Sequence, residues 1–403
     1  MIDFKDILDN QAKYKNGLKR KGVDFKVIDE VVKAYSKYIK VKEAVDKLRS
    51  QKNIAAKKKD IKTGNEVKRK LISKEKDLKS IQELLESLGI LIPNLPFKDV
   101  PLGGEENNKL IGKFGKISKL KNPKDHIQLG KDLDIIDIER GVKTSGSRFY
   151  FLKNQAVELE FALIQWVMAL LKKEKFELLV TPQLVKDKVM SAGGYLGQAK
   201  DEIYKTQDNL YLIGTSEQSI LGFHMGETIT VPKRYAAFST CFRREAGSYG
   251  QDVKGIIRTH QFDKVEMFSF VNPKDSIKEH EKLVGLEEKI LRELKIPYQK
   301  VLVAAGDLGM SAAKKIDLES WIPSQKRYRE THSCSNCTDW QARRANIRFK
   351  NKEGKTEFVH TINGTAIAIG RLLVALLENH QQSDGSVKIP KVLHKYLGFK
   401  EIK

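Results

Sequence analysis

Between residues 24 and 88, apolar side chains recur at intervals of three and four positions in a background of lysine and glutamate. Such spacing lines one face of a helix with apolar groups. The stretch has no proline and a single glycine, Gly64, so its composition favours long helices. The apolar positions form two stripes, interrupted at Lys42 and Lys74: Ile28, Val31, Tyr35, Tyr38 and Val45, then Val67, Leu71, Leu78, Ile81, Leu85 and Leu88.

A polar stretch at residues 57–65 separates the two stripes and predicts a chain reversal. The two helices then pack on each other as an antiparallel hairpin that ends at Gly89. Prolines at positions 93, 96 and 101 and the Gly103-Gly104 pair follow, and they predict a linker. We therefore expect residues 1–98 to form an N-terminal helical domain and residues 99–403 a second domain.

After residue 110 the pattern changes to short β-rich runs divided by turns. Residues 235–242 and 256–270 predict two strands of a long hairpin, joined by the glycine-rich loop 246–255. Strands linked by hairpins, with few crossover helices, predict an α+β fold with an antiparallel sheet. Further elements are expected as helices at 157–171 and 366–382, an extended run at 176–182, and strands at 299–304, 316–322, 328–335, 345–350 and 357–361.

The distribution of charge predicts what the helical domain binds. The chain of 403 residues has a formal net charge of +22, which indicates a polyanionic partner. From Lys40 to Lys76 there are fourteen lysines and arginines against five acidic residues. These charges would suit the solvated outside of a coiled coil, but their one-sided sign favours contact with an RNA backbone.

The chain begins with a polar segment of mixed charge, and no run approaches the 18 or so apolar residues that a membrane helix needs. Its three cysteines are too few for a disulfide framework. We therefore expect a cytoplasmic protein without membrane association.

Nucleotide chemistry is predicted at Arg243, Arg244 and Glu245, because paired guanidinium groups bind phosphate well. This triplet alone is weak evidence, and the sequence has no G-x-x-x-x-G-K-[ST] phosphate loop. However, FRREAGSYG at 242–250 and GIIRTHQFDKVE at 255–266 together resemble the second signature motif of class II aminoacyl-tRNA synthetases, in the form found in seryl-tRNA synthetases.

Other segments extend this resemblance in the expected order along the chain. The helix before Pro182 resembles the first signature motif, which lies at the dimer interface in the family and implies a homodimer. The hairpin resembles the family's tRNA-binding arm. The remaining matches are TSE at 215–217, RETHSCSN at 329–336, QARR at 341–344, and the third motif in HTINGT at 360–365, GR at 370–371 and ENHQ at 378–381.

The resemblance implies an enzyme that forms seryl-adenylate from L-serine and ATP and then transfers serine to tRNA(Ser), and also to tRNA(Sec). Arg243 would bind the α-phosphate and the serine carboxylate, and Arg371 would hold the γ-phosphate. These two are the predicted catalytic residues. Glu245 would accept from the adenine amino group, Phe262 would stack on the adenine ring, and the backbone near Thr259 would contact it.

The same resemblance assigns the rest of the site. Arg244, Thr331 and His332 complete the predicted ATP site, while Glu330 and Ser333 would hold Mg²⁺, which prefers oxygen ligands. In the serine site, the implied residues are Thr215, Ser216 and Glu217 for the ammonium, Arg243 for the carboxylate, and Glu266 and Thr365 for the hydroxyl. A carboxylate that needs the substrate hydroxyl would discriminate against alanine.

Some features allow other interpretations. Cys334 and Cys337, with His332 nearby, lack the further ligands of a structural zinc site, so no zinc is expected. The hairpin is shorter than the usual bacterial arm, and Ala366 stands where many members have glycine. Two alternatives stay open: a ligase that loads serine onto a carrier protein, against which the hairpin argues, and a non-catalytic RNA-binding paralogue, against which the intact motif residues argue.

Overall fold

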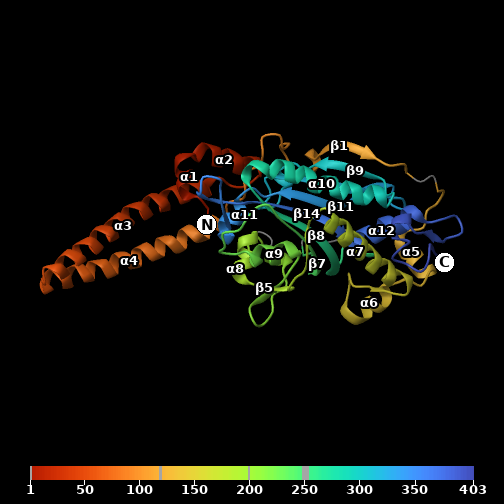
Figure 1. Ribbon diagram of the computed structural model, residues 1–403, viewed down its shortest axis with the longest axis horizontal. Helices are drawn as coiled ribbons and strands as arrows, with labels where there is room; N and C mark the ends of the chain where they lie inside the picture. Colours follow the sequence, from red (N-terminus) through yellow and green to blue (C-terminus); the bar gives the residue numbers. More distant parts are fainter. Residues whose placement is uncertain (1, 118–119, 198–199, 247–253) are drawn as a thin grey trace. The chain divides into compact units, whose positions relative to one another are not determined.

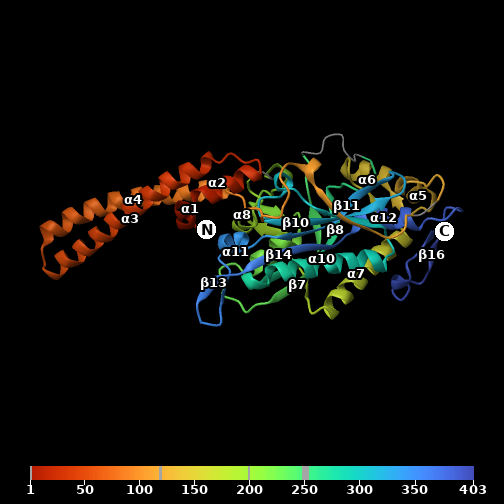
Figure 2. The same cartoon turned by 90° about the horizontal axis from the view of Figure 1, so that it is seen from above.

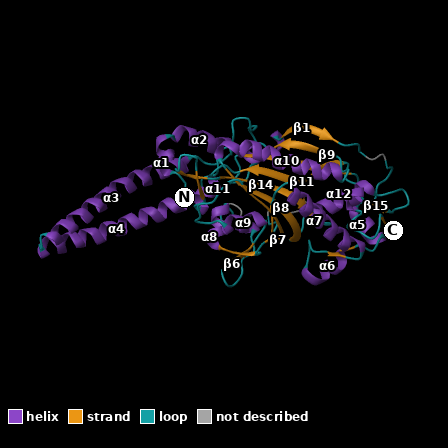
Figure 3. Cartoon of the chain, in the orientation of Figure 1, coloured by secondary structure: helices purple, strands orange, loops and turns teal. Residues whose placement is uncertain are grey.

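The computed structural model describes residues 2–117, 120–197, 200–246 and 254–403. The chain divides into two compact units, residues 1–96 and 97–403. Helices α1 to α4 build the first unit, and a large sheet with its covering helices builds the second (Figures 1 and 3).

The first unit contains the predicted antiparallel hairpin. It consists of α3 (Lys26–Lys57) and α4 (Ile61–Ile90), which run side by side over their whole length (Figure 1). Two short helices, α1 (Phe4–Asp9) and α2 (Gln11–Arg20), add to the core at the base of the hairpin. Eight of the eleven predicted stripe residues are buried, and Tyr35, Tyr38 and Leu78 are half-buried.

The reversal between the two helices is shorter than the predicted stretch 57–65. Only Lys58, Lys59 and Asp60 lie between α3 and α4. The Asp60 side chain accepts a hydrogen bond from the backbone N–H of Thr63 at 3.1 Å and caps α4, so the helix begins at Ile61. Gly64 therefore lies inside the first turns of α4, where its small propensity cost is tolerated.

The second unit is built on an eight-stranded sheet in the order β1-β9-β10-β11-β14-β8-β7-β4. Neighbouring strands are antiparallel, as predicted, except that the edge strand β4 pairs parallel with β7. The strands are β1 (Lys109–Phe114), β4 (Glu177–Val180), β7 (Lys233–Phe242), β8 (Gln261–Val271), β9 (Tyr298–Leu302), β10 (Lys314–Ile322), β11 (Arg327–Asn336) and β14 (His360–Ala368).

Three predicted strands differ from the structure by more than two residues at one end or are divided. Residues 256–260 precede β8 without being part of it, because their backbone bonds go elsewhere: His260 donates from its N–H to Arg148 and accepts from the N–H of Arg243. Residue 345 ends helix α11 (Trp340–Ala345), and β12 covers only Arg348–Lys350. The predicted strand 357–361 is divided between β13 (Thr356–Phe358) and the start of β14.

Three long helices cover the sheet and form the main core with it. They are α7 (Gln155–Lys173), α10 (Ser276–Glu293) and α12 (Ile369–His380), and α12 begins three residues after the predicted position 366. Figure 2 shows α7 and α10 along the sheet. Among the described helices, none combines the length and the apolar character needed to cross a membrane.

Candidate active site

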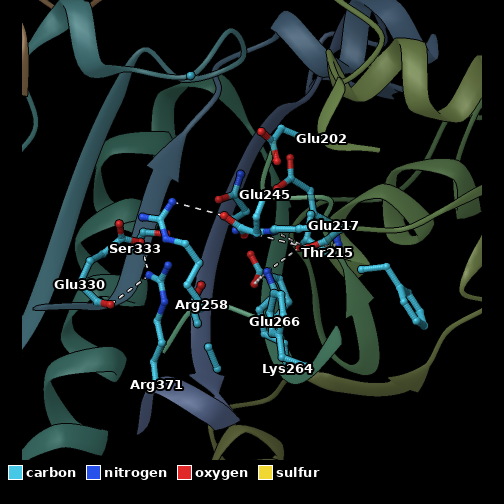
Figure 4. A pocket seen from close by; sticks show the side chains of 18 of the residues that line it. Glu202, Thr215, Glu217, Glu245, Arg258, Lys264, Glu266, Glu330, Ser333 and Arg371 are labelled. Atoms are coloured by element: carbon cyan, nitrogen blue, oxygen red, sulfur yellow. Dashed lines mark hydrogen bonds and ion pairs between the residues drawn. The ribbon is translucent and has the colours of Figure 1, made fainter. Parts of the chain in front are cut away.

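A cavity of about 620 Å³ opens on the sheet of the second unit, between residues of β7, β8, β11 and β14 (Figure 4). Twelve of the fifteen predicted site residues line it. They are Thr215, Glu217, Arg243, Glu245, Thr259, Phe262, Glu266, Glu330, Thr331, Ser333, Thr365 and Arg371.

Strand alternation explains why β8 contributes three of the lining side chains. Phe262, Lys264 and Glu266 occupy every second position, so all three point to the cavity face. Thr365 of β14 lies directly opposite Glu266 in the register of the two strands. A carboxylate and a hydroxyl therefore face the cavity as a cross-strand pair.

Lys264 connects this pair to helix α9 (Ser216–Phe223). Its ammonium nitrogen lies 2.7 Å from Oε2 of Glu266 and donates a 2.7 Å hydrogen bond to Oγ1 of Thr215. Thr215 is the N-cap of α9, and its Oγ1 also accepts from the backbone N–H of Glu217 at 3.3 Å. Lys264 is 5% exposed, so this ion pair is shielded from bulk water.

Glu217 is a second buried carboxyl in the same part of the cavity. Burial and the neighbouring charge of Glu266 raise its pKa to about 7, against the opposing effects of a hydrogen bond from Gln341 and the positive charge of Lys264. Tyr195 donates a longer hydrogen bond, 3.4 Å, to its Oε2. An ammonium ligand would supply the positive charge that this carboxyl group needs to ionise.

The opposite part of the cavity is rich in arginine (Figure 4). Arg243 lies with its guanidinium 5.3 Å from the centre of the Phe262 ring and donates to the carbonyl of Gly214. Arg371 donates to the backbone carbonyl of Glu330 at 3.0 Å and lies 3.3 Å from its carboxylate. Such a cluster of cations suits a polyphosphate.

A second arginine–carboxylate pair lies nearby. Arg258, which the sequence reasoning did not select, donates to Glu245 at 3.3 Å. Glu245, three residues beyond the end of β7, has a positive φ of 50°, which is uncommon outside glycine and suits a constrained position. Two cavity arginines, Arg258 and Arg371, are thus paired with carboxylates.

An irregularity in β11 places Glu330 and Ser333 on the same face of the sheet. Residues three positions apart in a regular strand point to opposite faces. However, His332 pairs with Leu318 and Glu330 pairs with Glu319, so Thr331 is an extra residue, a β-bulge. The bulge turns Glu330 into the cavity beside Ser333.

Glu330 and Ser333 offer hard oxygen atoms in this position. Burial opposes ionisation of Glu330, but the positive charges of Arg371, Lys315, Arg243 and Arg258 outweigh it and hold its pKa below the ordinary value. The Glu330 side chain is still 44% exposed and so accessible to a ligand. An ionised, accessible carboxylate beside a hydroxyl fits the ligand preference of Mg²⁺.

Three predicted residues are not among those that line the cavity. Ser216 is fully buried, with its hydroxyl directed to the carbonyl of Ala237. Arg244 donates its backbone N–H to Glu202. His332 is fully buried on the other side of β11, because strand alternation separates it from Ser333, and burial lowers its pKa to about 4. Its Nδ1 lies 2.9 Å from Oγ1 of Thr331.

The cysteine pair near His332 is also buried. Cys334 lies with its sulfur 3.9 Å from the carbonyl of His280, while Cys337 accepts from the side-chain amide of Asn363 at 3.5 Å. Both are free thiols. Residues 247–253 of the predicted glycine-rich loop lie outside the described residues.

Several residues that line the cavity are not among the predicted site residues. Lys264 had a usable signal, because it lies between Phe262 and Glu266 at the alternating positions of β8. Arg258 and Asn363 lie inside the motif segments 255–266 and 360–365, whereas Tyr195, Glu202 and Lys315 come from distant segments that no motif marks.

Comparisons with known proteins match both units. The model of the seryl-tRNA synthetase N-terminal domain matches residues 1–96, and that of the tRNA synthetase class II core domain (G, H, P, S and T) matches residues 200–380. The serine–tRNA ligase of Corynebacterium kroppenstedtii is 42% identical, over 99% of this chain and 98% of its own length. The serine–tRNA ligase of Sulfurihydrogenibium is 50% identical over 76% of this chain and 75% of its own length.

Solved structures agree with this result. Seryl-tRNA synthetase from Pyrococcus horikoshii, complexed with ATP, superposes with a TM-score of 0.93 at 38% identity and covers 100% of this chain and 99% of that one. The cytoplasmic serine–tRNA ligase of Naegleria fowleri, in complex with AMP, gives a TM-score of 0.91 at 30% identity with the same coverage. The chain therefore belongs to the seryl-tRNA synthetases, the serine–tRNA ligases of class II.

Proposed function

We propose that the cavity binds serine over the Lys264–Glu266 pair and ATP over the arginine cluster, so that the serine carboxylate meets the α-phosphate beside Arg243. The observation that carries this proposal is the gathering of twelve predicted residues in one cavity, with Glu217 and Glu266 around Lys264 in one part and arginines paired with carboxylates in another (Figure 4). Such a division matches a ligand with an ammonium group and a ligand with a polyphosphate.

The serine half of the site is defined by its buried charges and hydrogen-bonding groups. Glu217 and Thr215 receive the serine ammonium, and Glu266 with Thr365 receives its hydroxyl. Glu266 is 2% exposed and directly opposite Thr365, so a substrate without the hydroxyl would leave buried polar groups unpaired. Ser216 contributes by fixing the turn at the start of α9 through its hydroxyl contact with Ala237.

The ATP half of the site contains two arginine–carboxylate pairs. Arg371 and Arg258 lie against Glu330 and Glu245, and phosphate or adenine groups would replace or extend these contacts. Phe262 offers its ring to adenine, with Thr259 at the edge of the cavity. Arg244 and His332 do not line the cavity themselves. They flank Arg243 and Thr331, which do.

The reaction follows from this placement. A serine carboxylate oxygen forms a bond to the α-phosphorus, the bond from that phosphorus to the bridging oxygen breaks, and pyrophosphate leaves with the bonding electron pair. Arg243 and Arg371 neutralise charge on the phosphates during this step. The chain needs no side-chain nucleophile, because it positions and neutralises the reactants. In the second step the tRNA ribose hydroxyl attacks the seryl carbonyl, and AMP leaves.

Glu330 and Ser333 are the residues proposed to hold Mg²⁺, and the bulge at Thr331 turns Glu330 into the cavity beside Ser333. When bound, the ion would neutralise charge on phosphate oxygens. Glu330 is already held ionised by the surrounding arginines and Lys315, which keeps it ready to bind a cation.

The first unit is proposed to bind tRNA(Ser), with tRNA(Sec) as a further substrate. Lys57, Lys58, Lys59 and Lys62 are exposed at the turn between α3 and α4, where nothing in the unit covers them. Clustered exposed lysines are suited to contact phosphates. The match of residues 1–96 to the family's N-terminal domain supports the same assignment.

A homodimer is proposed from the surface around α7 and β4. Phe161 of α7 is 64% exposed, and Val180 of β4 is 78% exposed. Exposed large apolar groups on neighbouring elements are typical of a subunit interface. A reducing, cytosolic location is proposed with it, since all three cysteines are free and buried.

The test is serine-dependent exchange of pyrophosphate into ATP, followed by charging of total tRNA with labelled serine in the same preparation. The proposal expects both activities, with Mg²⁺ required for exchange. Exchange without charging would contradict the role of the first unit, and loss of serine dependence would contradict the assignment of the Glu217 and Glu266 half. Size-exclusion chromatography with light scattering tests the dimer.

A further inference from the structure

A fully buried glutamine lies directly behind Glu217. Gln341, in the first turn of α11, is 0% exposed and donates from Nε2 to Oε1 of Glu217 at 2.5 Å. The two residues are 124 positions apart in the chain and belong to different elements. Gln341 is absent from the residues that line the cavity, so this glutamine contacts Glu217 from its protein side.

Gln341 is itself held by a second buried residue. Thr361 of β14, also 0% exposed, donates from Oγ1 to Oε1 of Gln341 at 2.6 Å. The backbone of Thr361 is fixed in turn: its N–H donates to the carbonyl of Thr338, and its carbonyl accepts from the N–H of Cys337, both at 2.9 Å. Because Oε1 of Gln341 accepts from Thr361, the amide NH₂ group must face Glu217.

The charges around Glu217 mean that the hydrogen bond from Gln341 affects the ionisation of its carboxyl group. Glu266 in the cavity carries a like negative charge, and Lys264 opposes its effect. The Tyr195 hydroxyl donates to Oε2 of Glu217, while the Thr215 hydroxyl accepts from the backbone N–H of Glu217. Burial and Glu266 disfavour the ionised carboxylate, whereas the Gln341 hydrogen bond favours it. Gln341 is therefore a donor that both orients Glu217 and supports its negative charge.

We infer that Thr361 and Gln341 form a buried hydrogen-bonded relay that positions Glu217 for recognition of the serine ammonium. Gln341 is a positioning residue, since it acts through Glu217 and does not touch substrate. QARR at 341–344 is one of the segments that carry the family resemblance, and the contact with Glu217 assigns its first residue to the serine half. The inference rests on the proposed role of Glu217.

The test compares Gln341→Met with the wild type in pyrophosphate exchange. Loss of one hydrogen bond to a charged group is expected to raise the KM for serine by about 10- to 100-fold, while the KM for ATP stays within about twofold. The acid limb of the pH profile of kcat/KM for serine is expected to move to higher pH, because the remaining carboxyl ionises less readily. A side chain with a merely structural role would not move this limb.

A matched pair at Thr361 keeps the inference testable even if the Gln341 variant folds poorly. Thr361→Val removes the hydroxyl and is expected to shift serine KM and the acid limb in the same direction but less. Thr361→Ser keeps the donor and is expected to behave like the wild type. Equal behaviour of the valine and serine variants would overturn the relay.

Glu217→Gln separates failure of the inference from failure of the proposed function. If this variant keeps wild-type serine KM, Glu217 does not recognise the ammonium and the proposed function fails at this residue. If Glu217→Gln loses serine binding while Gln341→Met keeps both its serine KM and its acid limb, only the relay is wrong. A parallel rise of the serine and ATP KM values in Gln341→Met would also contradict it, since the relay predicts an effect on serine alone.

Discussion

The ammonium nitrogen of Lys264 lies 2.7 Å from Oε2 of Glu266, two positions along the same strand and on the same face of the sheet. Both side chains are almost completely buried. A carboxylate in such a place would be costly without a positive partner. The proposed hydroxyl recognition by Glu266 therefore depends on a lysine that is not part of the predicted site.

Replacing Lys264 with methionine keeps the length of the side chain and removes its charge. We expect a loss of about 3–5 kcal/mol in the free energy of unfolding, because Glu266 is left buried without its partner. We also expect kcat/KM for serine to fall by about 10- to 100-fold. Denaturant unfolding and pyrophosphate exchange measure the two effects.

The double variant Lys264→Met/Glu266→Gln is the control. With the unpaired charge gone, much of the stability should return, but serine use should stay low because the carboxylate is missing. If the double variant is as unstable as the single one, the loss arises from packing at position 264 and the electrostatic explanation is wrong.

The raised pKa of Glu217 predicts a pH dependence of serine use. Its value of about 7 means that the carboxyl group of the free enzyme is increasingly protonated as pH falls below 7. A protonated carboxyl cannot pair with the serine ammonium, so kcat/KM for serine should fall by about tenfold per pH unit below that point. Pyrophosphate exchange from pH 5.5 to 8.5 measures it, and the KM for ATP serves as the comparison. A flat serine profile across pH 7 would be incompatible with this assignment.

Local pattern was enough to predict the helical hairpin and the central strands. The stripes along α3 and α4 repeat every three to four residues, and β7 and β8 are long runs with a recognisable loop between them. The predicted bounds were wrong where single hydrogen bonds decide them: the Asp60 side chain caps α4 earlier than composition suggests, and the backbone hydrogen bonds of His260 keep residues 256–260 out of β8. Such contacts are not visible as periodicity.

Cavity residues that belong to the family motifs, such as Arg243 and Glu330, could be predicted from the sequence. What pattern could not provide is the β-bulge at Thr331, which depends on the register with β10 and places Glu330 on the cavity face. The relay through Gln341 could not be predicted either, because it joins segments 124 residues apart. Lys264 could have been predicted from the alternation of side chains along β8.

Glu330→Gln tests the proposed Mg²⁺ site. The amide keeps the size of the side chain but loses the negative charge, so the Mg²⁺ concentration for half-maximal exchange should rise on the order of tenfold or more. Glu319→Gln is a matched control, because Glu319 lies opposite Glu330 in the register of β10 and β11 but does not line the cavity. Equal Mg²⁺ requirements in the two variants would remove Glu330 from the metal site.

Removing three charges from the tip of the first unit tests its role in tRNA binding. The variant with Lys57, Lys58 and Lys59 changed to alanine should raise the KM for tRNA in charging and reduce its salt dependence, while pyrophosphate exchange stays unchanged. Changing Lys13, Lys15 and Lys19 of α2 to alanine alters the net charge equally and serves as the control. If both triple variants lower charging to the same extent, general charge and not the tip accounts for tRNA affinity.

Glu287 of α10 provides a prediction about stability. It is 0% exposed, and in the described structure neither of its carboxyl oxygens has a hydrogen-bond partner, so burial, reinforced by the nearby charge of Glu266, raises its pKa well above the ordinary value. As pH rises above the ordinary value of about 4.3, the unfolded chain releases this proton while the folded chain keeps it. The contribution of Glu287 to the free energy of unfolding of the wild type therefore decreases with rising pH.

Glu287→Met removes this linkage. Its stability relative to the wild type should increase by about 1.4 kcal/mol per pH unit above pH 5, until the buried carboxyl of the wild type ionises. Urea unfolding at pH 5, 6 and 7 measures the difference, and Glu281→Met, at an exposed position of the same helix, should show none of this pH dependence. A constant stability difference between Glu287→Met and the wild type at all three pH values would mean that Glu287 is ionised in the folded protein. A positive partner or water would then have to lie beside it, since an isolated charge at this depth would not be stable.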